Sequence, residues 1–303
     1  MTTDSPKLLS ELSAAFGSAR IRTNETLARH CNWRAGGPAD LFFIARTVEE
    51  LSRALSICHQ FETPATIIGF GANSLISDNG VRGLVILNRA HRIAFQPDSI
   101  IEADSGTNLV ILAKEAAAHG VSRFEFLIGI PGTVGAAVAV NAGTRTEWIS
   151  ALVQDVQVYT NTGADTWLAS AEMEFSYRHS KLKDTGEVVL TARLKGQPDE
   201  PKRIEQRISE YLQVRKNQPT GPSAGSVFKN PTGDFAGRLI EACGLKGFQI
   251  GGAQISEMHA NFIINVGEAK AQHIKQLIDK IKVDVSKRFA IELEEEIRYL
   301  GEW

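Results

Sequence analysis

The longest stretch of the sequence without a charged side chain runs from residue 126 to residue 144. Its length would suffice for a helix that crosses a membrane. However, Pro131 cannot donate the hydrogen bond that a helix interior needs, and Gly129, Gly132, Gly135 and Gly143 favour a turning backbone. We therefore predict a soluble protein in which this stretch forms loops whose small side chains leave space for another molecule.

The overall charge excludes some classes of partner. The 303 residues include 33 Lys and Arg against 35 Asp and Glu, which gives a formal net charge of -2. This balance provides no general attraction to nucleic acid or to an anionic membrane. Hydrophobic residues make up 43% of the chain, which is enough for a sizeable core. We expect a monomer that binds small molecules and has neither nucleic-acid nor membrane partners.

The cysteines and the first residues of the chain favour the cytoplasm. Cys31, Cys58 and Cys243 are odd in number, lie far apart and form no C-x-x-C motif. Neither a disulfide framework nor a zinc site is therefore expected, and we predict no metal ion. Asp4 and Glu11 interrupt the apolar residues near the N-terminus, which argues against a secretory signal.

Helical and strand-like patterns follow one another irregularly and indicate the α+β class. Apolar spacing, a capping box at Thr47 and Glu50, and glycine end signals predict helices at 6–16, 48–58, 108–119, 204–212, 235–243 and 269–289. Apolar runs predict strands at 39–45, 66–68, 84–87, 100–101, 153–159, 188–194, 261–266 and 291–300. Boundaries near 85–100 and 200–220 divide the chain into domains of residues 1–90, 91–200 and 201–303.

The first glycine-rich loop, residues 69–74, follows a predicted strand and reads Gly-Phe-Gly-Ala-Asn-Ser. Successive N–H groups in such a turn can converge on a phosphate, and glycine lets a ligand approach the backbone. Ser74 stands where a dinucleotide fingerprint needs its third glycine, and no sustained helix follows, so the usual βαβ motif is absent. A simple turn that ends the strand is the alternative.

The second glycine-rich loop, residues 129–143, combines three closely spaced glycines with a proline and small side chains. Close packing of the backbone against another segment would explain this composition without a ligand. Two such loops in one chain nevertheless favour a dinucleotide held largely by backbone amides.

Two polar segments carry candidate catalytic and binding residues. Arg178 lies between two predicted strands, and its guanidinium could fix a carboxylate or stabilise a developing enolate; the alternative is a solvated surface cation. In residues 223–231, Ser226 offers a hydroxyl, and Lys229 and Asn230 offer donors to an anionic, oxygen-rich ligand. The hydroxyls of such a turn often cap nearby backbone groups instead.

Alternation along residues 291–300 places two groups of side chains on opposite faces of the last predicted strand. Glu292, Glu294, Glu296 and Arg298 share one face, which would by default be solvated. If a ligand covered the end of this face, burial and like charge would raise the pKa of Glu296, whereas Arg298 would lower it. The sequence does not decide between these two effects.

Six motifs occur in an order that resembles the family of UDP-N-acetylenolpyruvoylglucosamine reductases, in its compact type II form. They are residues 69–75, 129–136, 177–180, 224–231, 245–252 and 293–298. The resemblance covers about residues 20–301 and implies a vanillyl-alcohol-oxidase-type FAD-binding fold. Residues 1–90 and 91–200 would then be its two subdomains, followed by a substrate-binding domain.

The resemblance also implies site residues. The catalytic residues would be Arg178, Ser226 and Glu296, and Asn230, Arg298 and Lys229 would contact the substrate. Arg34, Lys216 and His259 are further candidates for ligand contacts. FAD would be held by Gly69, Gly71, Ala72, Asn73, Ser74, Leu75, Gly129, Ile130, Pro131, Gly132, Thr133, Gly135 and Ala136.

The reaction implied by the resemblance completes UDP-N-acetylmuramate for peptidoglycan. NADPH reduces FAD, hydride passes to the vinyl carbon of the enolpyruvyl ether, Arg178 and protonated Glu296 stabilise the enolate, and Ser226 protonates the adjacent carbon. The alternatives are a related FAD-dependent sugar or hydroxy-acid oxidase and a non-catalytic nucleotide-sugar binder. The broken fingerprint disfavours a flavin-free NAD-dependent dehydrogenase.

Overall fold

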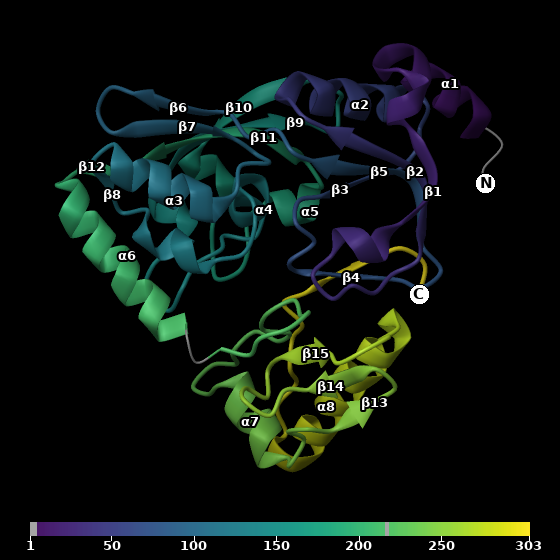
Figure 1. The fold of residues 1–303 in the computed structure, drawn as a ribbon, viewed down its shortest axis with the longest axis vertical. Coiled ribbons are helices and arrows are strands. Elements are labelled where there is room, and N and C mark those ends of the chain that lie inside the picture. Colours follow the sequence, from purple (N-terminus) through teal and green to yellow (C-terminus); the bar gives the residue numbers. More distant parts are fainter. Residues whose placement is uncertain (1–4, 216–217) are drawn as a thin grey trace.

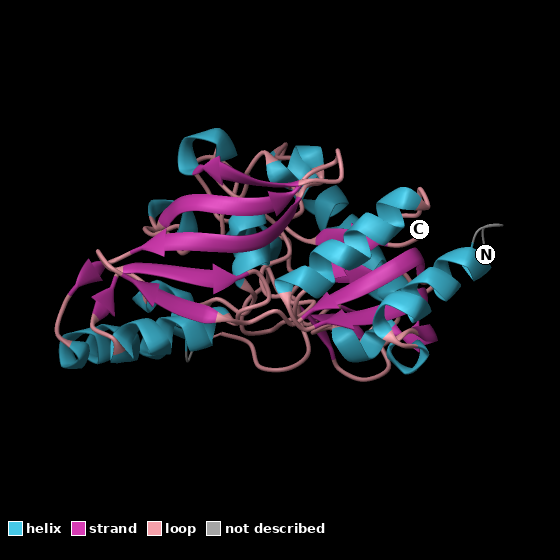
Figure 2. Ribbon diagram, turned by 90° about the horizontal axis from the view of Figure 1, so that it is seen from above, coloured by secondary structure: helices cyan, strands magenta, loops and turns pink. Residues whose placement is uncertain are grey.

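A computed structural model describes residues 5–215 and 218–303 of the chain. Two sheets lie side by side with helices packed against them, and the C-terminal third of the chain lies beneath them (Figure 1, Figure 2). This mixture of helices and mostly antiparallel strands confirms the predicted α+β class. Within the described residues, no helix is both long and apolar enough to cross a membrane.

The first sheet has the strand order β1-β2-β5-β3. Its strands are β1 (Arg22–Thr26), β2 (Pro38–Ala45), β5 (Val81–Asn88) and β3 (Ala65–Ile68). Alternation along β2 sends Leu41 and Phe43 to the face covered by α1 (Ser5–Phe16) and α2 (Val48–Gln60), and Phe42 to the other face. Thr47 caps α2 as predicted, but Glu50 accepts the N–H of Arg46 rather than completing the capping box.

The second sheet is antiparallel throughout and has the order β10-β9-β11-β7-β6. Its strands are β10 (Asp165–Ala169), β9 (Val153–Tyr159), β11 (Val188–Lys195), β7 (Ile100–Asp104) and β6 (Ile93–Gln96). Beneath it pack α3 (Leu109–Ala118), α4 (Val134–Ala139), α5 (Leu182–Thr185) and α6 (Pro201–Arg215), while β12 (Gln197–Pro198) pairs with β8 (Val121–Ser122) (Figure 1). Asn108 caps α3 by accepting the N–H groups of Val110 and Ile111.

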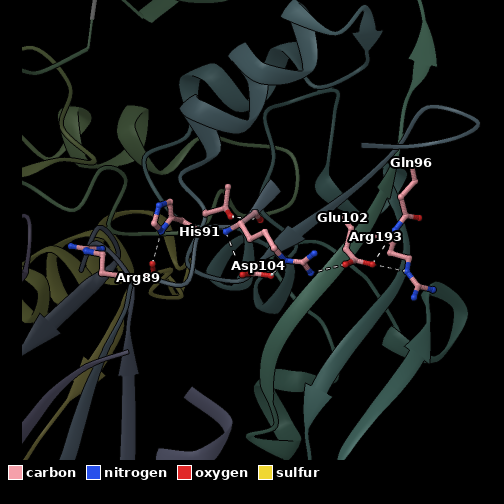
Figure 3. Close-up of polar contacts among 8 residues, drawn as sticks. Arg89, His91, Gln96, Glu102, Asp104 and Arg193 are labelled. Atoms are coloured by element: carbon pink, nitrogen blue, oxygen red, sulfur yellow. Dashed lines mark hydrogen bonds and ion pairs between the residues drawn. The ribbon is translucent and has the colours of Figure 1, made fainter. Parts of the chain in front are cut away.

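Alternating charges cross the second sheet from strand to strand. Glu102 of β7 pairs with Arg92 at 2.7 Å and with Arg193 of β11 at 3.2 Å, and Arg193 reaches Asp155 of β9 at 3.3 Å. Figure 3 shows the Glu102 carboxylate with Gln96 and Arg193 on one side of it, both within hydrogen-bond distance. Because each charge faces an opposite one across the strands, these pairs support the register of the sheet.

The C-terminal third consists of α7 (Ala236–Ala242), α8 (Ala271–Phe289) and a small sheet of β13 (Gln249–Ile250), β14 (Ala253–Ile255) and β15 (Ile263–Asn265). Buried Trp33 and Leu75 from the first part of the chain extend into its core. Asp78 accepts the N–H groups of Ala271 and Gln272 at 2.9 and 3.0 Å, and therefore caps α8 from a distant segment.

Short 3-10 helices connect several of these elements. They are Ser18–Arg20, Leu27–His30, Glu125–Gly129, Ile149–Ala151 and Ser170–Met173.

The structure corrects three predicted elements. The last strand, β16, spans only Arg298–Leu300 and pairs in parallel with β4 (Ser74–Ile76), instead of running from residue 291. Residues 129–143 are not entirely loop, because the hydroxyl of Thr133 accepts the N–H of Ala136 and starts α4. The strand predicted at 261–266 is reduced to β15.

Candidate active site

One cavity of about 460 Å³ brings together segments that lie far apart in the sequence. Both glycine-rich loops line it, together with Arg178, Ser226, Glu296 and Arg298. A second cavity of about 590 Å³ adjoins it, because Gly69, Thr133 and Glu296 are among the residues that line both. Concave spaces of this size are typical of small-molecule and cofactor sites.

Several glycines of the two loops are required by packing of the chain itself. A Cβ on Gly69 would lie 2.8 Å from Thr133 Oγ1, so the two loops touch at this point. Gly71 has a φ of +57°, and its Cβ would lie 2.5 Å from Cys31 Cα. A Cβ on Gly135 would lie 2.7 Å from Ser105 Cβ. Close backbone packing, the alternative for the second loop, therefore explains Gly135, and packing likewise explains two glycines of the first loop.

Gly132 is different, because a Cβ at this position would meet only Leu109 Cδ1, at 3.8 Å. Gly132 lines the first cavity. The absence of a side chain here keeps space open on the cavity side rather than making room for another part of the protein.

The loops also present hydrogen-bond donors to the first cavity. No described residue accepts a hydrogen bond from the backbone N–H groups of six residues that line it: Phe70, Gly71, Ala72, Asn73, Gly132 and Thr133. Unpaired backbone donors in a concave site need a partner, and converging N–H groups favour the oxygens of a phosphate. The donors present therefore fit the diphosphate of a dinucleotide.

Arg178 is held in place on several sides. Its Nη1 donates to the carbonyl of Gly143 at 3.1 Å, its Nε lies 2.9 Å from Glu296 Oε1, and its guanidinium lies over the ring of Trp148. Its backbone φ of +56° is unusual for a residue with a side chain. With only 19% of its side chain exposed, Arg178 is not the solvated surface cation considered as the alternative.

Glu296 lies between the first glycine-rich loop and the segment of Ser226. Its carbonyl accepts the side-chain N–H of Asn73 at 3.0 Å, and its backbone N–H donates to Val227 at 2.8 Å. Burial raises the pKa of the Glu296 carboxyl above its ordinary value, although Arg178 and Lys229 act in the opposite direction. Burial therefore outweighs the cations that lower this pKa, and these are Arg178, Lys229 and Lys183 rather than Arg298, which the sequence suggested.

Ser226 reaches the same cavity from the C-terminal third of the chain. It forms an isolated bridge with Phe262, which also lines the cavity. Because Glu296 donates its N–H to the residue that follows Ser226, the two segments run alongside each other at the cavity wall. Arg178, Ser226 and Glu296 therefore converge on one space, as the resemblance implies.

The predicted substrate contacts are only partly brought to the site. Arg298 lines both cavities, and the surrounding protein lowers the pKa of its guanidinium. Lys229 pairs with Glu294 and lines neither cavity. The side-chain oxygen Oδ1 of Asn230 accepts the N–H of Ala236 at the start of α7, so this oxygen is engaged within the protein.

Other predicted residues lie away from the two cavities. Leu75 is buried in the core of the C-terminal third, and Gly129 is buried in a 3-10 helix; neither lines a cavity. Arg34 is exposed, and the ring of His259 lies tilted against that of Phe262; neither residue lines a cavity. Lys216 lies outside the residues that the structure describes. Gly69, Gly71, Ala72, Asn73, Ser74, Ile130, Pro131, Gly132, Thr133 and Ala136 line the first cavity, and Gly135 lines the second.

Some lining residues were missed by the sequence analysis. Asn32 and Gln218 line the first cavity, and Tyr159 and Lys183 line the second. No local pattern singles them out, because each lies outside the glycine-rich and polar motifs. In the described part of the chain, no group of three or more His, Cys, Asp or Glu side chains could hold a metal ion.

Comparisons with known proteins match two parts of this chain to family models. Residues 39–168 match an FAD binding domain, and residues 216–300 match the C-terminal domain of UDP-N-acetylenolpyruvoylglucosamine reductase. The UDP-N-acetylenolpyruvoylglucosamine reductase of Moorella thermoacetica is 46% identical over 285 residues, which are 93% of this chain and 94% of that protein. The enzyme of the same name from Lachnoclostridium phytofermentans is 38% identical over 302 residues, covering 97% of both chains.

A solved structure has the same architecture. The crystal structure of UDP-N-acetylenolpyruvylglucosamine reductase from Thermus caldophilus superimposes with a TM-score of 0.81 at 36% identity. The match covers 93% of this chain and 99% of that one. The likeness therefore extends over both sheets and the C-terminal third.

Proposed function

This chain belongs to the family of UDP-N-acetylenolpyruvoylglucosamine reductases, and from that premise we propose how its residues perform the reaction. The enzyme uses FAD and NADPH to reduce UDP-N-acetylenolpyruvoylglucosamine in the synthesis of peptidoglycan precursors. The convergence of Arg178, Ser226 and Glu296 on the cavity lined by both glycine-rich loops is the observation that carries the proposed mechanism.

The two loops would hold the diphosphate of FAD through their unpaired backbone N–H groups. When bound, FAD supplies the two-electron chemistry that connects NADPH with the enolpyruvyl double bond. The protein contributes the position of the substrate, polar side chains for the developing charge, and a proton. Each of these tasks has a residue at the cavity wall.

Arg178 binds the carboxylate of the enolpyruvyl group and stabilises the negative charge that develops on it. Glu296 Oε1 lies 2.9 Å from Arg178 Nε. A substrate carboxylate that pairs with Arg178 competes with Glu296 for this cation. Weakening of the Arg178–Glu296 pair raises the pKa of Glu296 further, and the neutral acid can then donate a hydrogen bond to the enolate.

Ser226 donates the proton to the carbon next to the ether oxygen. An isolated serine hydroxyl is a weak acid, so Ser226 acts as the last member of a local relay. Arg298 lines both cavities and carries positive charge toward the anionic UDP-sugar. In this assignment, residues 1–90 and 91–200 hold the cofactor and residues 201–303 complete the substrate site.

The remaining properties follow from charge and chemistry rather than from the site. A net charge of -2 gives no reason for nucleic-acid or membrane partners, and NADPH and UDP-sugars are intracellular metabolites. We therefore propose a monomeric enzyme of the cytoplasm.

The proposed function is tested by incubating the FAD-loaded protein with NADPH and UDP-N-acetylenolpyruvoylglucosamine and following the sugar by mass spectrometry. The sugar should gain two hydrogen atoms as NADPH is consumed. An unchanged sugar together with oxygen consumption on an alcohol substrate would instead identify an oxidase. A protein that binds the sugar without converting it would be a nucleotide-sugar binder.

Replacing Gly132 by alanine should weaken FAD binding without destabilising the apoprotein. The new methyl group has room within the protein, since only Leu109 Cδ1 lies nearby, at 3.8 Å. A ligand packed against this backbone would meet the methyl group directly. We expect at least about a tenfold higher Kd for FAD by fluorescence titration, equal to about 1.4 kcal/mol, with an unchanged Tm of the apoprotein. Wild-type affinity in this variant would show that FAD does not approach Gly132.

The reduction of the sugar should become slower as the pH rises through the elevated pKa of Glu296. Burial raises this pKa, so the protonated form persists to higher pH than in an ordinary carboxyl and is lost above the raised value. Stopped-flow measurement of sugar reduction by the reduced enzyme gives the profile directly. In Glu296→Gln, the fall in rate with rising pH should disappear, because the glutamine amide does not titrate. Persistence of the same fall in the variant would assign it to another group.

A further inference from the structure

Asn73 joins the first glycine-rich loop to the strand segment that carries Glu296. Its Nδ2 donates to the backbone carbonyl of Glu296 at 3.0 Å, across 223 residues of sequence. Its own backbone carbonyl accepts the N–H of Arg298 at 2.9 Å. Asn73 therefore holds the chain on both sides of Ile297, at the end of the glycine-rich loop that lines the cavity.

The other side of Glu296 is held by the segment of Ser226. The backbone N–H of Glu296 donates to Val227 at 2.8 Å, and Val227 in turn donates to the carbonyl of Asn261 at 2.9 Å. The two peptide groups of Glu296 are thus fixed by two different loops, and each of these loops lines the first cavity. Loss of either contact leaves one of the two hydrogen bonds that the described residues make to the backbone of Glu296.

The pairing of β4 with β16 continues from this contact. Arg298 is in register with Ser74, directly after Asn73, and Leu300 is in register with Ile76. The loop assigned to the cofactor and the segment of Glu296 therefore form one unit. The Asn73 side chain contacts the backbone of Glu296 and not its carboxyl. We therefore expect Asn73 to affect the reaction by setting the position of Glu296.

We propose that Asn73 is a positioning residue whose side-chain amide fixes Glu296 relative to the cofactor loop and Ser226. The inference rests on the proposed function, since it assigns a task to Asn73 in that same site. Small displacements of a catalytic group have large effects on rate, because the reacting atoms must lie within contact distance of one another. A hydrogen bond to the backbone on each side of Glu296 limits such displacement.

The test compares two variants of Asn73 with a matched control in the FAD-loaded protein. Asn73→Leu keeps nearly the same side-chain shape but lacks the Nδ2 donor. Asn73→Ala removes the donor and most of the side-chain volume as well. Asn265→Ala is the control, because Asn265 Nδ2 donates to the carbonyl of Trp33 at 2.7 Å and also links distant parts of the chain. Asn265 touches neither Glu296 nor the cavities.

We expect both Asn73 variants to slow reduction of the sugar by about tenfold to a hundredfold. Reduction of FAD by NADPH does not use Glu296 and should change less than about threefold. Asn265→Ala should lower the Tm, but it should not slow reduction of the sugar more than it slows reduction of FAD by NADPH. Asn73→Leu with the wild-type rate of sugar reduction, or a control variant with the same selective loss, would overturn the proposal.

The pKa of Glu296 provides a readout that does not depend on turnover. It can be measured by NMR titration of protein labelled with ¹³C at glutamate carboxyl carbons, with Glu296→Gln to assign the signal. The positive charges that face this carboxyl are Arg178, Lys229 and Lys183, and Arg298 shares both cavities with it. A looser Glu296 becomes more hydrated, so its pKa should fall in the Asn73 variants and stay unchanged in Asn265→Ala.

An unchanged pKa of Glu296 in both Asn73 variants would refute the positioning role, whatever their activity. If the wild-type protein itself failed to reduce the sugar, the proposed function would be wrong. The titration would in that case still show whether Asn73 fixes Glu296.

Discussion

Replacement of Ser226 by alanine is expected to slow reduction of the UDP-sugar by about 10²–10⁴-fold, the range typical of a positioned proton donor. The reduction of FAD by NADPH should remain near the wild-type rate, because that step needs no proton from Ser226. Anaerobic stopped-flow absorbance at the visible flavin band resolves the two steps: bleaching follows NADPH, and the return of colour follows the sugar.

Ser256→Ala is a suitable control for Ser226→Ala. The Ser256 hydroxyl is buried in the same third of the chain, and it accepts the backbone N–H groups of Met258 and His259. Its loss should lower the Tm and leave both half-reactions close to wild type. Equal loss of both half-reactions in a folded, yellow Ser226→Ala protein would contradict the assigned role of Ser226.

Replacement of Arg178 by methionine should slow sugar reduction by about 10²–10³-fold, because the variant removes the donors that face the developing negative charge. It should also change the pH profile. Arg178 lowers the pKa of Glu296, so removal of this cation raises that pKa, and the rate should fall at a higher pH than in the wild type. Measuring the rate of sugar reduction across the pH range distinguishes the lower maximal rate from the shift of the pH profile.

Arg145→Met provides the control for Arg178→Met. Arg145 is exposed, lies two positions after Gly143 and stacks on Phe235 without lining either cavity. This variant should keep the wild-type rate and pH profile. A shift of the Arg178→Met profile toward lower pH would contradict the contact of Arg178 with Glu296.

Local sequence signals predicted most of the α-helices but only half of the strands. Thr47 and Asn108 accept N–H groups at the starts of α2 and α3, and the alternation of Leu41, Phe42 and Phe43 matches the two faces of β2. These features depend on neighbours within a few residues, so the sequence is sufficient to predict them. Thr133 has the same local role at α4, which was missed because the glycines around it obscured the short helix.

The error in the last strand came from contacts between distant segments. Residues 291–297 alternate like a strand, but Lys229 donates its N–H to Glu294, and Glu296 donates to Val227. A loop thus replaces the partner strand that the pattern predicts. Only Arg298–Leu300 finds a strand, at β4, more than two hundred residues away in the sequence. No local pattern encodes that pairing.

The same distinction explains which of the predicted site residues the fold brings together. Arg178, Ser226, Glu296 and Arg298 were identified by motifs in their family order, and the fold brings them to one cavity. Asn230, predicted as a substrate contact, lines neither cavity, and its side-chain Oδ1 accepts the N–H of Ala236 at the start of α7. Asparagine side chains commonly serve such local backbone groups, and the sequence alone does not reveal which partner is chosen.

The crystal structure of the FAD-loaded protein with its UDP-sugar tests the central claim most directly. The account predicts density for the flavin in the cavity between residues 69–74 and 129–136, with the enolpyruvyl carboxylate at Arg178 and its double bond beside Ser226 and Glu296. A flavin bound elsewhere, or an enolpyruvyl group that contacts none of these three side chains, would contradict it.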